Sequence, residues 1–187
     1  MAVDADSFAQ ICDSLDRFMR ERLIPNEERV EAEDEVPPGI VEEMKALGIF
    51  GLSIPEAYGG LGLSLAQEAA VMQILGRTAA AFRSVAGTNI GIGSQGIVID
   101  GTEAQKAHYL PKLASGEIIA CFALTEPDAG SDAAALRTTA RREGEHYVLN
   151  GTKRYITNAP RAGLFTVMAR TGEAPGAAGI TAFLLPA

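Results

Sequence analysis

The chain has 187 residues, of which 47% are hydrophobic, so it can form one large domain or two small ones with a real core. Its 24 acidic and 16 basic residues give a net charge of −8, which argues against non-specific nucleic-acid binding because such binding requires a basic surface. The two cysteines, Cys12 and Cys121, lack metal-type spacing and indicate buried thiols in a reducing compartment.

The N-terminus and the apolar runs bear on membrane targeting. Asp4 and Asp6 precede a polar-faced helix, which is not typical of a signal peptide. The longest apolar runs are too short to span a bilayer. The prediction is therefore a cytoplasmic protein without membrane insertion.

Residues 1–116 predict antiparallel helices with short links, an all-α unit. Three segments fit the capping box, in which a hydroxyl and a glutamine amide bond free N–H groups at a helix start: Ser7–Gln10, Ser64–Gln67 and Thr102–Gln105. The first predicted helix ends near Pro25. The helix that begins at Thr102 ends near Tyr109, since Pro111 is expected to start a further turn, which Gly116 closes.

Three other features of this half are informative. The acidic stretch 26–36 is either a docking patch or a solvated surface, and the second interpretation is favoured because runs of charge usually face water. Pro37 and Pro38 are expected to open a helix that Gly48 ends. The glycine-rich stretch 80–99 indicates either close helix packing or a ligand pocket, and the sequence leaves both open.

From residue 117 the pattern changes to short strands. The expected strands are 118–124, 138–142, 146–149, 153–157, 164–169 and 180–185, with turns at Glu143-Gly144 and Asn150-Gly151. They predict an antiparallel, barrel-like sheet whose last strand leaves an open edge. The fold class is therefore α+β, with a helical domain over 1–116 and a β-domain over 117–187.

The segment after the first strand, Thr125 to Asp132, combines a proline, a glycine and hydroxyl and carboxylate side chains. These residues form turns and leave backbone N–H groups free to bind a polar ligand edge. Taken alone, such a short motif favours a capped surface turn over a ligand site.

Four segments together are similar to the flavin-dependent acyl-CoA dehydrogenases: 54–60, 101–111, 121–132 and 150–158. The resemblance implies FAD as cofactor and α,β-dehydrogenation of an acyl-CoA thioester, with hydride passing to the flavin. In that family a helical third domain follows the β-domain and carries the catalytic base, whereas this chain stops at Ala187. We therefore expect no catalytic residue here, weak FAD binding and no activity for this chain alone.

Carried over residue by residue, the resemblance implies these cofactor-binding residues: Phe122, Leu124, Thr125, Ser131, Tyr155, Ile156 and Thr157. The Thr125 hydroxyl would bond the pyrimidine edge of the flavin, and Thr157 would lie near its reactive nitrogen. Ser131 would also contact the acyl-CoA substrate at its phosphate side. Tyr155 occupies a position that is often Trp in relatives, which keeps an aromatic wall but makes it smaller.

Other catalytic arrangements find less support. Glu126 and Asp128 could form an acid–base pair, but ordering of their loop is the favoured interpretation. His108 and His146 are expected to be exposed, and nothing indicates a metal site. The resemblance implies acyl-CoA and an electron-transfer flavoprotein as partners and a homo-oligomer at full length. A flavin oxidase or monooxygenase of the same fold, and a non-catalytic partner subunit or truncated product, remain alternatives.

Overall fold

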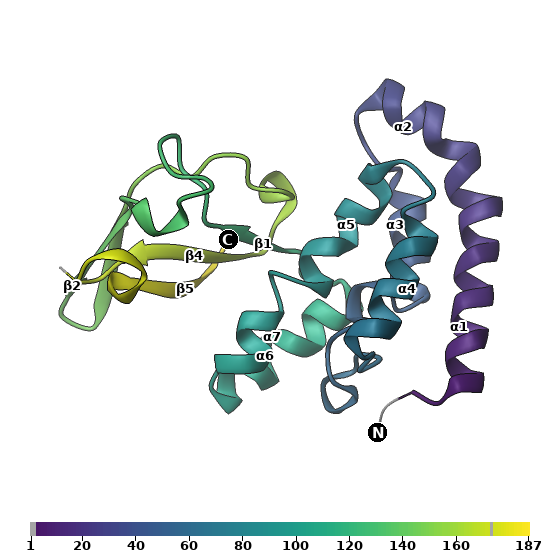
Figure 1. Ribbon diagram of the computed structural model, residues 1–187, viewed down its shortest axis with the longest axis horizontal. Coiled ribbons are helices and arrows are strands. Elements are labelled where there is room, and N and C mark those ends of the chain that lie inside the picture. Colours follow the sequence, from purple (N-terminus) through teal and green to yellow (C-terminus); the bar gives the residue numbers. More distant parts are fainter. Residues whose placement is uncertain (1–2, 173) are drawn as a thin grey trace. The chain divides into compact units, whose positions relative to one another are not determined.

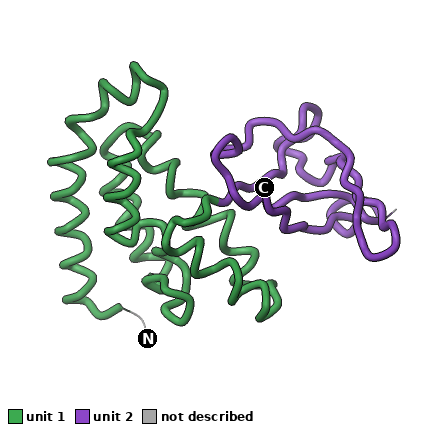
Figure 2. Tube along the Cα trace, turned by 180° about the vertical axis from the view of Figure 1, so that it is seen from behind, with its two compact units in different colours: residues 1–119 green, residues 120–187 purple. Residues whose placement is uncertain are grey.

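The computed structural model describes residues 3–172 and 174–187. The chain divides into two compact units, a helical unit (Met1–Ile119) and a sheet unit (Ala120–Ala187), which Figure 2 shows in different colours. In the described part of the chain, no helix has both the length and the apolar character needed to cross a membrane.

The helical unit contains successive helices that are joined by turns and loops (Figure 1). They are α1 (Ala5–Phe18), α2 (Glu27–Glu33), α3 (Pro38–Ala46), α4 (Leu65–Leu75), α5 (Ala80–Ile90), α6 (Gln95–Asp100) and α7 (Glu103–Ser115). A π-helical turn, Met19–Leu23, and a 3-10 turn, Ile24–Asn26, continue α1 through Pro25 into α2. Helix α1 packs beside α4.

Two of the three predicted capping boxes are confirmed. Ser64 caps α4 and Thr102 caps α7, each with its glutamine partner. The prediction for α1 is wrong because Asp4, one turn earlier, is the N-cap. Its carboxylate accepts hydrogen bonds from the N–H groups of Asp6 and Ser7 at 3.0 and 2.9 Å. A carboxylate at this end also interacts favourably with the helix dipole.

The predicted break in the last helix is also wrong, because α7 continues through Pro111 to Ser115. Leu110 and Leu113 are fully buried, whereas Pro111 is exposed. Packing on the buried side therefore holds the helix together where the proline removes one backbone bond. Gly116 ends α7 in the left-handed conformation, at φ 73°, as expected.

The core of the helical unit surrounds the segment between α3 and α4. Ile49, Phe50 and Leu52 in this segment are fully buried. Asn89 of α5 is also fully buried, and its amide donates to the carbonyl oxygens of Leu113 at 3.0 Å and Ile118 at 2.8 Å. A buried amide paired in this way fixes the end of α7 against α5.

The acidic stretch forms helix α2 and mostly faces solvent, as the favoured interpretation expects. Glu27 differs from its neighbours because its carboxylate accepts the backbone N–H of Ala79 at 2.7 Å, at the start of α5. One acidic residue of this stretch thus stabilises the start of another helix.

The sheet unit contains a five-stranded mixed sheet. Its strands are β1 (Ala120–Ala123), β2 (Thr139–Glu143), β3 (His146–Asn150), β4 (Leu164–Arg170) and β5 (Ile180–Pro186). Strand β4 is the centre: β5 pairs with it antiparallel along its full length, and β1 and β2 pair with it parallel. The α+β class is confirmed, but the expectation of a purely antiparallel sheet is wrong. The chain between β1 and β4 crosses over, so that β4 runs parallel to β1.

The β2–β3 hairpin turns at Gly144, φ 64°, as expected. The second predicted hairpin, at Asn150-Gly151, does not form, and Lys153–Thr157 is not a strand. Gly151 has another function: a Cβ atom there would lie only 2.3 Å from Oγ1 of Thr138. Close approach of two segments, and not a tight turn, explains this glycine.

Candidate functional site

The predicted site residues of the sheet unit lie on three segments. Phe122 is in β1, and Leu124 and Thr125 follow it directly. Ser131 lies in the loop after the turn 126–129. Tyr155, Ile156 and Thr157 lie in a non-regular segment between β3 and β4, which we call the 153–158 loop.

The structure brings the 153–158 loop to the end of β1. The backbone N–H of Arg154 donates to the carbonyl oxygen of Thr125 at 2.9 Å. The Lys153 ammonium donates to the carbonyl oxygen of Leu124 at 3.0 Å. Two of the segments that the sequence analysis singled out are therefore neighbours in space, although the residues that the Lys153–Leu124 bond joins are 29 positions apart in the chain.

A buried carboxylate lies beside this junction. Glu126 is 8% exposed, and its carboxylate pairs with the Lys153 ammonium at 2.8 Å. It also accepts the backbone N–H groups of Arg137 at 2.6 Å and Thr138 at 2.9 Å, and the Thr138 hydroxyl at 2.5 Å. We call Glu126, Thr138 and Lys153 the Glu126 cluster. It joins the end of β1, the approach to β2 and the 153–158 loop.

The surroundings of Glu126 determine its ionisation. Burial raises the pKa of its carboxyl, but the hydrogen bonds from Lys153, Thr138 and the Arg137 backbone outweigh burial and lower the pKa to about 2. The carboxylate is thus ionised at neutral pH and its oxygens are occupied. This geometry fits the interpretation that Glu126 orders its loop, and it argues against a general base.

Residues 126–129 form the turn that the sequence predicts. The N–H of Glu126 donates to the carbonyl oxygen of Ala129 at 2.9 Å, and the reverse bond is 3.3 Å long. Pro127 occupies the second position, where its fixed φ is favourable. Asp128 is exposed and lies 3.6 Å from the Arg137 guanidinium. Asp128 therefore contributes a surface ion pair rather than a member of the buried cluster.

Tyr155 has an unusual conformation. Its φ is 58°, in the left-handed region that aromatic residues rarely adopt, and its side chain is 78% exposed. The Arg154 guanidinium lies 4.5 Å from the centre of the ring. The strained backbone holds an aromatic face at the surface, where a planar ligand could stack on it.

The predicted hydroxyl groups differ in accessibility. Thr125 is half-buried, whereas Thr157 and Ser131 are exposed. Ser131 has no side-chain hydrogen bond within the part of the chain that the structure describes. Thr125 and the 153–158 loop are brought together, but in the described residues no hydrogen bond joins Ser131 to them.

Sequence reasoning missed Lys153 and Arg170. The Arg170 guanidinium donates to the carbonyl oxygens of Leu136, Ala134, Ala174 and Gly176, so it fixes the loops on both sides of it. The spacing of these residues in the chain gives no signal for either role.

Other candidate residues have simpler roles. His108 and His146 are exposed, as expected. Cys121 is fully buried, but Cys12 is only half-buried, so the expectation of two buried thiols holds for one of them. Burial raises the pKa of the Cys121 thiol to about 11, which leaves it inert at neutral pH.

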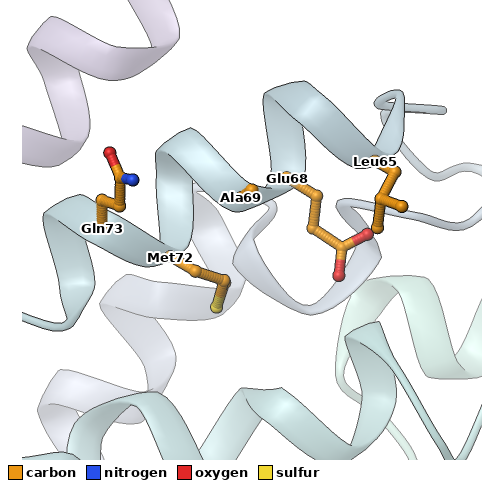
Figure 3. Close-up of a pocket in the computed structure, with 5 residues that line it drawn as sticks. All are labelled: Leu65, Glu68, Ala69, Met72 and Gln73. Carbon is orange, nitrogen blue, oxygen red and sulfur yellow. The ribbon is translucent and has the colours of Figure 1, made fainter.

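The helical unit has an open groove on α4 with a volume of about 480 Å³. Figure 3 shows Leu65, Glu68 and Met72 projecting from one side of this helix. Burial raises the pKa of the Glu68 carboxyl, which lies half-buried beside these apolar side chains. None of the predicted site residues lines this groove.

Two family models match the chain. The model described as acyl-CoA dehydrogenase, N-terminal domain, covers residues 6–117, and the model of the middle domain of the same family covers residues 121–187. The break between them coincides with the passage from the helical unit to the sheet unit.

Individual proteins are similar over nearly the whole chain. The (2S)-methylsuccinyl-CoA dehydrogenase of Cereibacter sphaeroides is 41% identical over 181 residues, which are 96% of this chain and 33% of that protein. An acyl-CoA dehydrogenase of Bacillus subtilis is 38% identical over 168 residues, 90% of this chain and 44% of that protein. A glutaryl-CoA dehydrogenase structure from Mycobacterium smegmatis, in complex with FADH2, superposes with a TM-score of 0.85 and 34% identity, over 98% of this chain and 46% of that one. The chain thus spans less than half the length of these three proteins.

Proposed function

Because this chain belongs to the acyl-CoA dehydrogenase family, we propose that it provides the helical domain and the flavin platform for α,β-dehydrogenation of an acyl-CoA thioester. FAD, when bound, supplies the acceptor for the hydride from the β-carbon. The observation that carries this proposal is the hydrogen bond from the Arg154 N–H to the Thr125 carbonyl oxygen, which brings two family-like segments together.

The residues at this junction suit an isoalloxazine ring. Thr125 offers a half-buried hydroxyl for the polar edge of the ring, next to Phe122 and Leu124 in sequence. Tyr155 offers an exposed aromatic face, with Ile156 and Thr157 following it in the same loop. Ser131 is proposed to contact the cofactor and the phosphate side of acyl-CoA from a separate loop. Together they orient the ring and exclude water from its face.

The base that removes the α-proton is not proposed among the carboxylates of this junction. Glu126 is fully hydrogen-bonded and its pKa is about 2, so it is a poor proton acceptor. Asp128 is exposed and pairs with Arg137. We therefore expect the 187-residue chain alone to show no dehydrogenase activity and to bind FAD only weakly, so that purified samples contain less than stoichiometric flavin.

The partners follow from the same proposal. We propose acyl-CoA as substrate, an electron-transfer flavoprotein as electron acceptor and assembly into a homo-oligomer. A cytoplasmic location is part of the proposal, supported by the two free thiols. An acceptor assay with and without oxygen on the active assembly separates a dehydrogenase from an oxidase or monooxygenase.

The test is a titration of the purified chain with FAD, followed by quenching of flavin fluorescence. Replacing Thr125 by Val should weaken binding about tenfold, which corresponds to one hydrogen bond to the cofactor. Thr181→Val is the matched control, because Thr181 is exposed on β5 and is expected to leave the affinity unchanged. Equal affinities of the wild type and Thr125→Val would contradict the proposed role of Thr125, and an absence of any FAD binding at millimolar concentration would contradict the platform.

A further inference from the structure

We propose that Glu126 and Lys153 are positioning residues, whose ion pair holds the 153–158 loop and the Tyr155 ring at the end of β1. This inference rests on the proposed function, because the held ring is the proposed wall of the flavin site. It assigns a role to two residues that do not themselves face the cofactor.

The Glu126–Lys153 ion pair is buried and connects the 153–158 loop with the end of β1. The Lys153 side chain is 12% exposed and the Glu126 side chain 7%, and their charged atoms are 2.8 Å apart. The Lys153 ammonium also donates to the Leu124 carbonyl oxygen at 3.0 Å. The Lys153 side chain thus binds both the Leu124 backbone at the end of β1 and the Glu126 side chain in the following turn. Breaking a buried pair leaves an uncompensated charge, so the link is hard to open.

The loop needs such a link because regular structure does not hold it. In the described residues, the Arg154–Thr125 bond is the backbone hydrogen bond that ties residues 151–157 to another segment. Tyr155 and Asn158 both have positive φ, 58° and 65°. A left-handed backbone at an aromatic residue is costly and persists only where the surroundings enforce it.

The other charges near the pair do not take its place. Asp128 and Arg137 are exposed and face each other at 3.6 Å. The Arg154 guanidinium lies over the Tyr155 ring. Thr138 supports the pair at the same carboxylate oxygen, because its N–H and its hydroxyl both donate to Oε1 of Glu126, to which Lys153 also donates. Removal of Glu126 or Lys153 should therefore make the 153–158 loop mobile while the strand pairing of the sheet remains intact.

The experiment measures amide hydrogen exchange by NMR in the 187-residue chain without flavin. Lys153→Met keeps most of the apolar stem and removes the charge. We expect exchange at the Arg154 amide to become at least tenfold faster, while amides in the β4–β5 ladder change less than threefold. Lys153→Arg should restore slow exchange, because the guanidinium can donate to both Glu126 and Leu124. Lys106→Met, which removes the Lys106–Glu103 pair of α7, is the matched control and should leave Arg154 unchanged.

Two results would overturn the proposal. One is unchanged exchange at Arg154 in Lys153→Met. The other is equal acceleration in the loop and in the β4–β5 ladder, which would show that the pair stabilises the whole sheet and does not position the loop. If Lys153→Met does not fold, Glu126→Gln gives the same readout, since it removes the charge that Lys153 pairs with while the amide oxygen still accepts hydrogen bonds at one of the two carboxylate positions.

The outcome is independent of the FAD titration. Exchange as expected, together with no FAD binding by the wild type, would refute the proposed function and leave the positioning role of the pair intact. FAD binding by the wild type, together with unchanged exchange in Lys153→Met, would refute the positioning role alone.

Discussion

The Arg154 guanidinium lies 4.5 Å from the centre of the Tyr155 ring, although the two residues are adjacent in the chain. In an extended backbone, the side chains of adjacent residues point to opposite sides. Tyr155 instead has a left-handed φ of 58°, and the side chains of Arg154 and Tyr155 lie together. Because the ring is 78% exposed, the contact gains little from burial, so the backbone conformation is maintained by other parts of the sheet unit.

Replacing Tyr155 by glycine tests the cost of this conformation. Glycine adopts positive φ freely, so Tyr155→Gly should raise the free energy of unfolding by up to about 1 kcal/mol. Tyr155→Ala is the matched control, because it removes the ring and keeps the strained backbone. Urea unfolding measures both variants. A glycine variant less stable than the alanine variant would show that relief of the strain is smaller than the extra backbone entropy that glycine loses on folding.

The Glu126 carboxyl should make the sheet unit sensitive to acid. Its pKa is lowered from 4.5 to about 2 in the folded chain, so the stability it contributes is complete above pH 4.5 and is lost as the pH falls toward 2. A shift of this size corresponds to about 3 kcal/mol. Urea unfolding at pH 6 and pH 3 should show a smaller loss for Glu126→Gln than for the wild type.

The control for that experiment is Glu31→Gln, which alters an exposed carboxylate on α2. It should lose stability with falling pH as the wild type does. If Glu126→Gln also followed the wild-type curve, another group would be responsible for the acid sensitivity.

Gly151 should not tolerate even a methyl group. A Cβ atom at this position would lie 2.3 Å from Oγ1 and 2.7 Å from the Cα atom of Thr138, so the backbone would have to move. We expect Gly151→Ala to lower the free energy of unfolding by about 3 kcal/mol. Gly130→Ala is the matched control, because nothing lies within 4 Å of its Cβ position, and it should be nearly neutral. Similar thermal midpoints for the two variants would contradict the close approach at Gly151.

The two cysteines should react at very different rates. Cys121 is fully buried with its pKa raised to about 11, whereas Cys12 is half-buried on α1. Titration with a chromogenic disulfide reagent at pH 8 should label Cys12 at least 100-fold faster than Cys121. Cys12→Ser identifies the fast site. Fast labelling that persists in this variant would mean that the β1 region opens readily.

The sequence predicts local structure better than strand pairing in this protein. Ser64 and Thr102 are recognisable as caps because each box acts within four residues. The same pattern at Ser7 misleads, because the N–H and the hydroxyl of Ser7 both donate to the Asp4 carboxylate, and Asp4 begins the helix. Local patterns also fail at Pro111, where the buried Leu110 and Leu113 override the proline.

The arrangement of the candidate site depends on distant pairings, and this is why the sequence shows only part of it. The resemblance to a family indicates Thr125 and Tyr155, but no spacing rule connects Glu126 with Lys153. Asn150-Gly151 carries a strong hairpin signal, yet the close approach of Thr138 determines its conformation. Charge pairing and steric contact across the fold are visible only in three dimensions.

The central position of β4 has a consequence for the order in which the sheet assembles. β2 and β3 are joined by a tight turn, and β4 and β5 by residues 171–179, so both pairs require only short loops to close. β1 must find β4 across residues 124–163, a far larger loop with a greater entropic cost. Pairing of β1 is thus expected to be the last step of folding in this unit. The proposed flavin platform, which lies at the end of β1, would become competent only when that slow step is complete.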